Sequence, residues 1–190
     1  MRVPRNLTRR VCPLEIATVL MTLAGIAALG IMSPGPDFLA VTHAAVTSSR
    51  YHAASVATGV VLGNGVLAGA ALFGVGALFA LFPTFFVAFK VIGGSYLILM
   101  GLKMILGAKK PLESKNTVAT TNQLKGFVKG FTVTMANPKA AIYYASALTA
   151  VAPKDASLSL LALMVAVVFC VAAVWFTCVV MFLSLSLIHI

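Results

Sequence analysis

Two short motifs place charged side chains beside prolines within apolar sequence. The first covers residues 33–37 and reads SPGPD, and the second covers residues 137–139 and reads NPK. Proline removes an amide donor and clashes with the preceding helical turn, so each motif interrupts a helix. Each therefore predicts a break in an apolar helix that carries one charge, which is negative at Asp37 and positive at Lys139.

Opposite charges at two such breaks fit the recognition of a small zwitterion. Gly35–Pro36 and Asn137–Pro138 each combine an N-cap residue type with proline at the first helical position. Each pair therefore starts a half-helix whose free amides and positive dipole end point into the break. We expect the carboxylate of Asp37 to meet a substrate ammonium, while Lys139 and the free amides meet a substrate carboxylate.

The same residues allow other roles. Asp37 and Lys139 can pair with each other purely for structure, or the first break can be a proline kink with a locally capped Asp37. Asp37 can instead, or also, carry a coupling proton, because burial disfavours the charged form of a carboxylate. Asn64 lies within a glycine-rich apolar segment, where an amide either hydrogen-bonds another helix or lines the pathway.

The composition places these motifs in an integral membrane protein. The chain has 190 residues, of which 61% are hydrophobic and 9% are charged, and its mean hydropathy is +1.04. A soluble domain has about 25% charged residues. One span needs about 20 apolar residues, so the chain holds about five or six spans and no separate soluble domain. The net charge of +10 lies mostly at the ends of apolar segments, which is the positive-inside pattern rather than a sign of nucleic-acid binding.

The apolar segments are the expected membrane spans. They cover residues 14–48 (broken at 34–36), 53–82, 85–106, 127–151 (broken at 137–139) and 158–187. The long polar region 108–125 is basic and is expected to be a cytoplasmic loop. Two small-residue pairs, Gly59 with Gly63 and Gly65 with Gly69, predict close helix packing in the second span.

The two breaks correspond when Pro36 is aligned with Pro138. Each break opens a similar unit, and an odd number of crossings separates the two units, which predicts inverted repeats with a site near the membrane midplane. The single transmembrane domain 1–190 therefore divides into a first repeat 1–107, the loop 108–125 and a second repeat 126–190. The predicted fold is an all-α polytopic membrane helix bundle with broken first and fourth helices.

Other classes of function have weaker support in the sequence. Cys12, Cys170 and Cys178 show no metal-ligand spacing. Inside the spans only Asp37 and His43 come close to a cluster of metal ligands, and their spacing makes no convincing site. No metal or other cofactor is therefore expected. His43 has no nucleophile at a helical offset, so we do not predict an enzyme. The open alternatives are a transporter of another small solute or cation and a membrane scaffold subunit that moves no substrate.

Four motifs in order give the chain a resemblance to a transporter family. They are PGPDFL at 34–39, GVVLGN at 59–64, KVIGGSYL with MGLK at 90–103, and NPKAA at 137–141. With these motifs the chain resembles the LysE/RhtB family of amino-acid exporters. The resemblance implies a multi-pass inner-membrane protein of six spans that exports threonine, homoserine, lysine or leucine in exchange for protons. It also places Asp37, Asn137, Pro138 and Lys139 at family motif positions.

The end of the sequence departs from this family. The family has a sixth helix preceded by a basic loop, and residues 185–190 fit its pattern poorly. We therefore expect a truncated gene model with five of six spans. The expected partners are an amino acid, protons and the lipid bilayer, without nucleic acid. The glycine faces also allow a homodimer.

Overall fold

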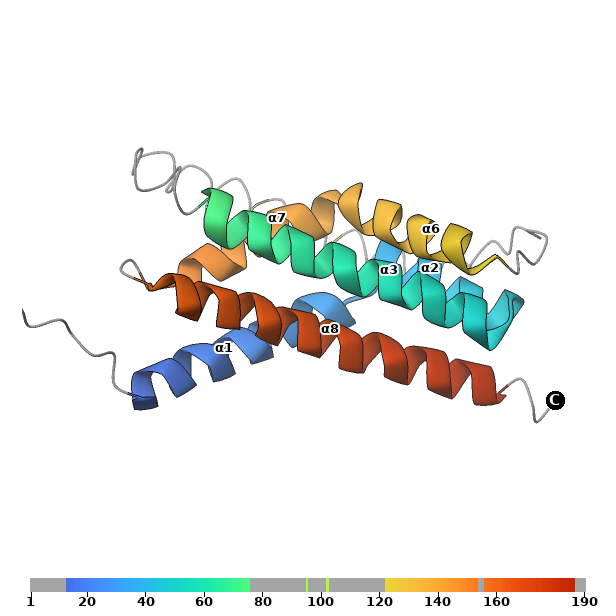
Figure 1. Ribbon diagram of the computed structural model, residues 1–190, viewed down its shortest axis with the longest axis horizontal. Coiled ribbons are helices and arrows are strands. Elements are labelled where there is room, and N and C mark those ends of the chain that lie inside the picture. The colour runs from blue at the N-terminus through green and yellow to red at the C-terminus, as the bar shows by residue number, and fades with distance from the viewer. Residues whose placement is uncertain (1–12, 76–94, 96–101, 103–121, 154–155, 187–190) are drawn as a thin grey trace, which may run out of the picture.

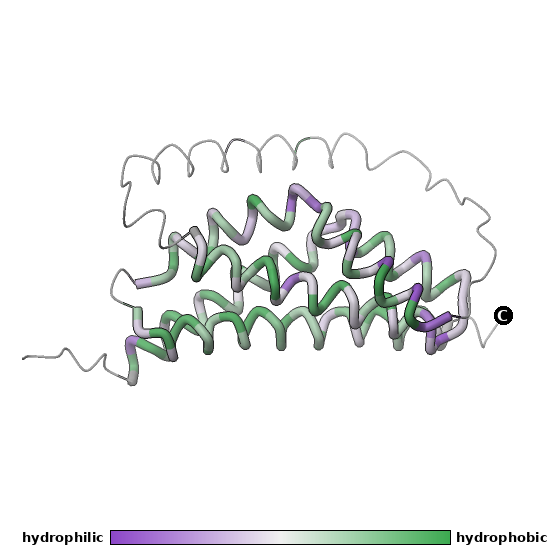
Figure 2. Tube along the Cα trace, turned by 45° about the horizontal axis from the view of Figure 1, so that its top comes forward, coloured by the Kyte–Doolittle hydropathy of each residue, from purple (hydrophilic) through white to green (hydrophobic). Residues whose placement is uncertain are grey.

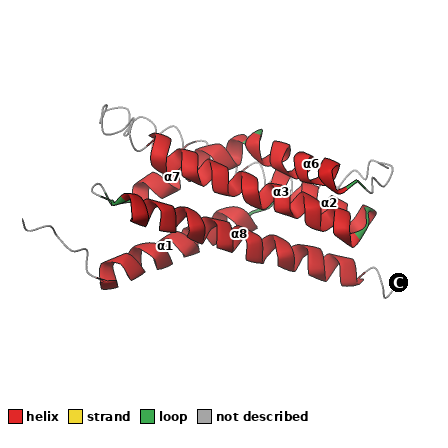
Figure 3. Ribbon diagram, in the orientation of Figure 1, coloured by secondary structure: helices red, strands yellow, loops and turns green. Residues whose placement is uncertain are grey.

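The computed structural model describes residues 13–75, 95, 102, 122–153 and 156–186. Every element in these ranges is a helix (Figure 3). The elements are α1 (Pro13–Met32), α2 (Pro36–Thr47), α3 (Arg50–Gly69), the π-helical segment η1 (Ala70–Val75), α6 (Gln123–Met135), α7 (Pro138–Val151) and α8 (Leu158–Ser186). Most of the predicted span 85–106 and of the predicted loop 108–125 lies outside the described residues.

The described helices have the lengths and compositions of membrane spans. Three segments in this part of the chain are long and apolar enough to cross a membrane, namely Leu14–Met32, Arg50–Gly74 and Leu158–Ser184. Figure 2 shows hydrophobic residues along most of the helices, with hydrophilic residues gathered near one end and at a few places midway along the bundle. The predicted all-α membrane helix bundle is therefore confirmed.

Both predicted helix breaks are present at the predicted positions. Residues 33–35 separate α1 from α2, and residues 136–137 separate α6 from α7. Gly35 and Asn137 are the N-caps of α2 and α7, and each is followed by proline in the first helical turn. Proline is tolerated there because the amide that it lacks has no partner in the first turn of a helix.

Two helices begin about one turn before their predicted starts. Ser49 caps α3, because its Oγ accepts the backbone amide of His52 at 3.3 Å. Asn122 caps α6, because its Oδ1 accepts the backbone amide of Lys125 at 3.2 Å. Side-chain oxygens of this kind satisfy amides that have no partner within the helix. The polar residues before each apolar run are therefore already helical.

The two broken helices run in opposite directions (Figure 1). The pair α1–α2 points one way along the bundle and α6–α7 points the other, and α3 is likewise antiparallel to α8. The helix contacts show the same relation between the two units. The helix before the first break, α1, packs against α8, which follows the second broken helix, and the helix before the second break, α6, packs against α3, which follows the first. This is the relation expected between inverted repeats. The division of the whole chain into two repeats remains a prediction, because the predicted span 85–106 of the first repeat lies mostly outside the described residues.

Small residues bring α3 and α6 into direct backbone contact. A Cβ atom on Gly59 would meet the backbone oxygen of Phe127, and one on Gly63 would lie 2.8 Å from the Cβ of Thr134. The first predicted glycine pair is therefore confirmed as a close-packing surface. The second pair does not line this seam, since a Cβ on Gly65 would lie 3.1 Å from the ring of Phe169 in α8 and one on Gly69 would meet nothing within 4 Å.

One face of α8 is buried against the rest of the bundle. Met164, Val168, Ala172 and Phe176 are 0–1% exposed and recur every four residues, which is the period of one helix face. Side chains on the other face, such as Phe182 at 73% exposed, are apolar as well. An apolar outer face fits lipid as the surrounding solvent.

Candidate functional site

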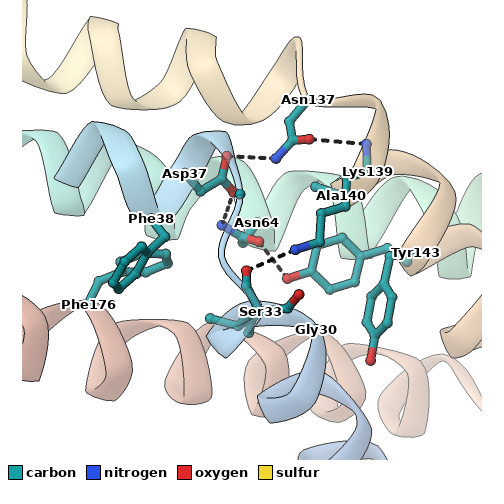
Figure 4. Close-up of a pocket in the computed structure, with 13 residues that line it drawn as sticks. Gly30, Ser33, Asp37, Phe38, Asn64, Asn137, Lys139, Ala140, Tyr143 and Phe176 are labelled. Carbon is teal, nitrogen blue, oxygen red and sulfur yellow. Dashed lines mark hydrogen bonds between the residues drawn. The ribbon is translucent and has the colours of Figure 1, made fainter. Parts of the chain in front are cut away.

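The two helix breaks meet at one small cavity of about 30 Å³ (Figure 4). Its lining residues are Gly30, Ile31, Ser33, Gly35, Asp37, Phe38, Asn64, Asn137, Lys139, Ala140, Tyr143, Tyr144 and Phe176. Five of the predicted site residues are among them, from α3 and from both breaks. The other two, Pro36 and Pro138, do not line the cavity and instead begin the half-helices beside it.

Asp37 accepts hydrogen bonds from two side chains that are distant in the sequence. Its Oδ1 accepts the Nδ2 amide of Asn137 at 2.9 Å, which joins the first break to the second. Its Oδ2 accepts the Nδ2 amide of Asn64 from α3 at 3.4 Å, a long and therefore weaker bond. Two amide donors from different helices orient this carboxylate beside the cavity.

Lys139, which belongs to the second break, reaches across the cavity to the first break. Its Nζ donates to the backbone oxygen of Ser33 at 2.8 Å and to that of Pro34 at 3.3 Å. These carbonyls follow the last turn of α1, where no further helical turn supplies amide donors. A cation is favourable at this end because the helix dipole is negative there. The side chain of Lys139 is only 8% exposed, so its charge depends on these partners.

The two charges face one cavity but do not bond to each other. The Asp37 carboxylate accepts hydrogen bonds from the two asparagine amides. The partners of the Lys139 ammonium are the two carbonyls of the first break. The alternative in which Asp37 and Lys139 form a direct structural ion pair is therefore not the arrangement found.

The two half-helices differ at their amino ends. In α7, the Oδ1 of Asn137 accepts the backbone amide of Lys139 at 3.1 Å and so caps its own helix. The N-cap of α2 is Gly35, which makes no side-chain cap. Of these two amino ends, only that of α2 lacks a side-chain cap, which refines the prediction that both offer free amides.

The missing side chain of Gly35 also leaves room for a cation. Its φ of −163° is extended backbone that any residue can adopt, so the backbone conformation does not require glycine. A Cβ at this position would lie 3.3 Å from Lys139 Nζ. Glycine therefore lets the ammonium of Lys139 lie close to the amino end of α2.

Tyr144 extends the hydrogen-bond network of Asp37 and was not predicted. Its hydroxyl donates to Oδ1 of Asn64 at 2.5 Å, and its side chain is 2% exposed. The Nδ2 of Asn64 also donates to the backbone oxygen of Val60 at 2.8 Å. Both ends of this amide therefore have fixed partners, which turns its NH₂ group toward Asp37. The only signal in the sequence is a tyrosine within an apolar span, where the hydroxyl needs a partner.

Tyr143, the neighbouring tyrosine, joins α7 to α1. Its hydroxyl donates to the backbone oxygen of Ile26. Its ring packs against Gly30 so closely that a Cβ there would clash with it. This contact holds the helix that carries Lys139 against the helix whose terminal carbonyls Lys139 binds.

Tyr144→Phe should lower the stability of the protein. The change leaves Oδ1 of Asn64 buried without its donor, which costs about 1–3 kcal/mol. The matched control is Tyr51→Phe, because the side chain of Tyr51 is 76% exposed. Thermal unfolding in detergent should show a lower midpoint for Tyr144→Phe only. Equal midpoints for the two variants would contradict the role given to the buried hydroxyl.

Together these features define a class of protein. Two interrupted helices of opposite direction hold a carboxylate and an ammonium beside one cavity within a membrane helix bundle. Secondary transporters build their substrate sites in this way. The sequence comparison agrees, since the profile of the family described as "LysE type translocator" matches residues 28–189. The chain belongs to this family, and the predicted resemblance is confirmed.

Individual relatives support the same assignment. The threonine efflux protein of Escherichia coli (strain K12) is 36% identical over 132 residues, which cover 67% of this chain and 64% of that protein. The threonine efflux protein of Salmonella typhi is 34% identical over 131 residues, with the same coverage of 67% and 64%. An uncharacterized membrane protein of Haemophilus influenzae is 28% identical over 137 residues, covering 70% of this chain and 65% of that protein. The chain therefore spans slightly less than two thirds of the length of these relatives. No solved structure matches it.

Proposed function

We propose that this protein is a secondary active exporter of small amino acids of the threonine, homoserine, lysine or leucine type. It would work by proton-coupled antiport across the inner membrane. Membership of a translocator family and the similarity to threonine efflux proteins support amino-acid export. The observation that carries the proposal is that Asp37 and Lys139, with opposite charges, face one cavity at two helix breaks. A zwitterionic cargo has one complementary group for each charge.

In this proposal each predicted site residue has a defined task. Asp37 meets the ammonium of the cargo, and Asn64 and Asn137 orient its carboxylate group. Lys139 and the uncapped amino end of α2 meet the carboxylate of the cargo. Pro36 and Pro138 start the half-helices that create the site, together with the N-cap Gly35.

The cavity at the site is small in the part of the chain that the structure describes. A cavity of about 30 Å³ has room for about one or two water molecules, since about 10–15 Å³ of such space holds one. A threonine molecule needs several times this space, so the two breaks must separate during transport. Rocking of one repeat against the other around a fixed site would provide that opening.

The proposed homodimer needs a surface other than the first glycine pair. Gly59 and Gly63 face α6 of the same chain. These glycines are therefore already used for packing within the protomer. A dimer would form through another face of the bundle.

Transport by the purified protein in proteoliposomes tests the proposed function. We expect efflux of L-threonine above that of protein-free liposomes, driven by an inward proton gradient. The analogue without the carboxylate, 1-amino-2-propanol, and the analogue without the ammonium, 2,3-dihydroxybutyrate, should each compete at least about tenfold more weakly than threonine. Each lacks one charge-assisted hydrogen bond, and such a bond contributes about 1.5–3 kcal/mol. Equal competition by either analogue would contradict recognition of a zwitterion.

A further inference from the structure

The end of α1 forms a cation site that the protein itself fills. The backbone oxygens of Ser33 and Pro34 accept the ammonium of Lys139 at 2.8 and 3.3 Å. Figure 4 shows this ammonium pointing across the cavity toward the first break, away from its own helix. In transporters with broken helices, the carboxyl ends of half-helices are places where cations bind.

The chemical group at this site is the one that an amino acid carries. The side chain of Lys139 ends in a primary ammonium with three donor hydrogens and no acceptor. The ammonium of a zwitterionic amino acid has the same charge and the same number of donors. Carbonyls that accept the first are therefore chemically suited to accept the second. Asp37 supplies the negative charge on the same cavity.

We propose that the carbonyls of Ser33 and Pro34, together with Asp37, form the ammonium subsite for the cargo, and that Lys139 occupies this subsite in the empty transporter. This inference rests on the proposed function. When cargo enters, its ammonium replaces that of Lys139 on the carbonyls, and Lys139 turns to the cargo carboxylate. Hydrogen bonds are exchanged and no covalent bond changes.

The charge of the site is the same in both states. Empty, it holds one carboxylate and one ammonium, those of Asp37 and Lys139. Loaded, it holds these two groups and a zwitterion, so the sum is again zero. Apart from a coupling proton, either state can therefore close within the membrane without burying a net charge, which would be costly.

The role of Lys139 in the empty state separates two modes of transport. Without an ammonium at residue 139, the empty site must close over unpaired carbonyls and an uncompensated carboxylate, which costs free energy. The loaded site has the same net charge in this variant, but the cargo ammonium pairs with the carbonyls and with Asp37, and the amino end of α2 still meets the cargo carboxylate. Net efflux requires the transporter to return across the membrane without an amino acid, whether or not it carries a proton, whereas exchange of internal for external amino acid does not.

The test compares these two modes for the full chain in proteoliposomes. For Lys139→Met, net efflux of labelled threonine should fall at least about tenfold relative to the unmodified protein. Exchange against saturating external threonine should fall by a clearly smaller factor than net efflux, with a higher KM because Lys139 no longer contacts the cargo carboxylate. The matched control is Lys129→Met on the exposed face of α6, which should leave both modes unchanged.

Other outcomes identify which proposal fails. Equal loss of both modes in a folded Lys139→Met protein, or loss of neither, would overturn the role of Lys139 in the empty state. If Lys139→Met does not fold, Lys139→Ala with added ethylammonium provides a second test, since the added amine should restore both folding and net efflux. Failure of that rescue would also overturn the inference. If the unmodified protein moves threonine in neither mode, the proposed function itself is wrong.

Discussion

Gly130→Ala should keep the bundle from assembling stably, because α3 and α6 touch backbone to backbone at this residue. A Cβ on Gly130 would meet the backbone oxygen of Val56 and lie 3.1 Å from the amide nitrogen of Val60. Neither atom belongs to a flexible side chain that can turn away, so the helices would have to separate. Gly59 has the reverse relation with Phe127 on α6, and Gly59→Ala should therefore have the same effect.

The expected loss of stability is large for a change of one methyl group. Overpacking a tight contact typically costs 1–3 kcal/mol, and we expect about 3 kcal/mol or more here because backbone atoms must move. Gly25→Ala and Gly69→Ala are matched controls, since a Cβ at either position meets nothing within 4 Å. Alanine favours a helix over glycine by about 0.8–1.0 kcal/mol, so both controls should be neutral or stabilising.

Two measurements in detergent check this prediction. The first is the fraction of purified protein that is monodisperse, and the second is the midpoint of thermal unfolding. Both should fall for Gly130→Ala and Gly59→Ala but not for the controls. If Gly130→Ala behaves like Gly25→Ala, the direct backbone contact between α3 and α6 is wrong.

The helix breaks were predictable from the sequence because proline acts locally. The lost amide donor and the clash with the preceding turn depend only on the residue and its neighbours. An asparagine or glycine before the proline then marks the start of the new helix. For this reason the starts of α2 and α7, at Pro36 and Pro138, agree with the prediction.

The partners of the two charges were not predictable in the same way. Lys139 binds carbonyls that lie 105 and 106 positions away in the sequence, and such a contact depends on the depth and angle at which two helices cross. The same holds for the bond from Asn137 to Asp37, which are 100 positions apart. These residues could be predicted as site candidates from the sequence, but only the packing of the bundle determines which of their groups form hydrogen bonds with each other.

The glycine pairs show a similar limit. The pairs at 59 and 63 and at 65 and 69 have the same spacing, yet only the first faces α6. Small residues at this spacing permit close approach, but the spacing does not say which neighbour lies opposite. Tyr144 was missed for a related reason, because its role depends on the position of Asn64 on another helix.

Asp37→Asn should produce the largest loss of transport among single changes at the site. Asparagine has nearly the same shape, but it removes the only carboxylate among the described residues that line the cavity. Its NH₂ group would also face at least one of the two amide donors that now serve Asp37. A charge-assisted hydrogen bond contributes about 1.5–3 kcal/mol. Its loss should therefore raise the KM for threonine about 10- to 100-fold.

The pH gradient separates the two roles proposed for this carboxylate. If Asp37 only binds the ammonium of the cargo, efflux by Asp37→Asn at saturating threonine should still accelerate when an inward proton gradient is applied. If Asp37 also carries the coupling proton, that acceleration should disappear, because the side-chain amide of asparagine does not take up or release a proton at the pH of the transport assay. Glu15→Gln is the matched control, since it makes the same chemical change in the exposed first turn of α1. It should alter neither the KM for threonine nor the acceleration by the proton gradient. An unchanged KM together with normal coupling in Asp37→Asn would remove Asp37 from the mechanism, because the cavity would then bind and move its cargo without a negative charge.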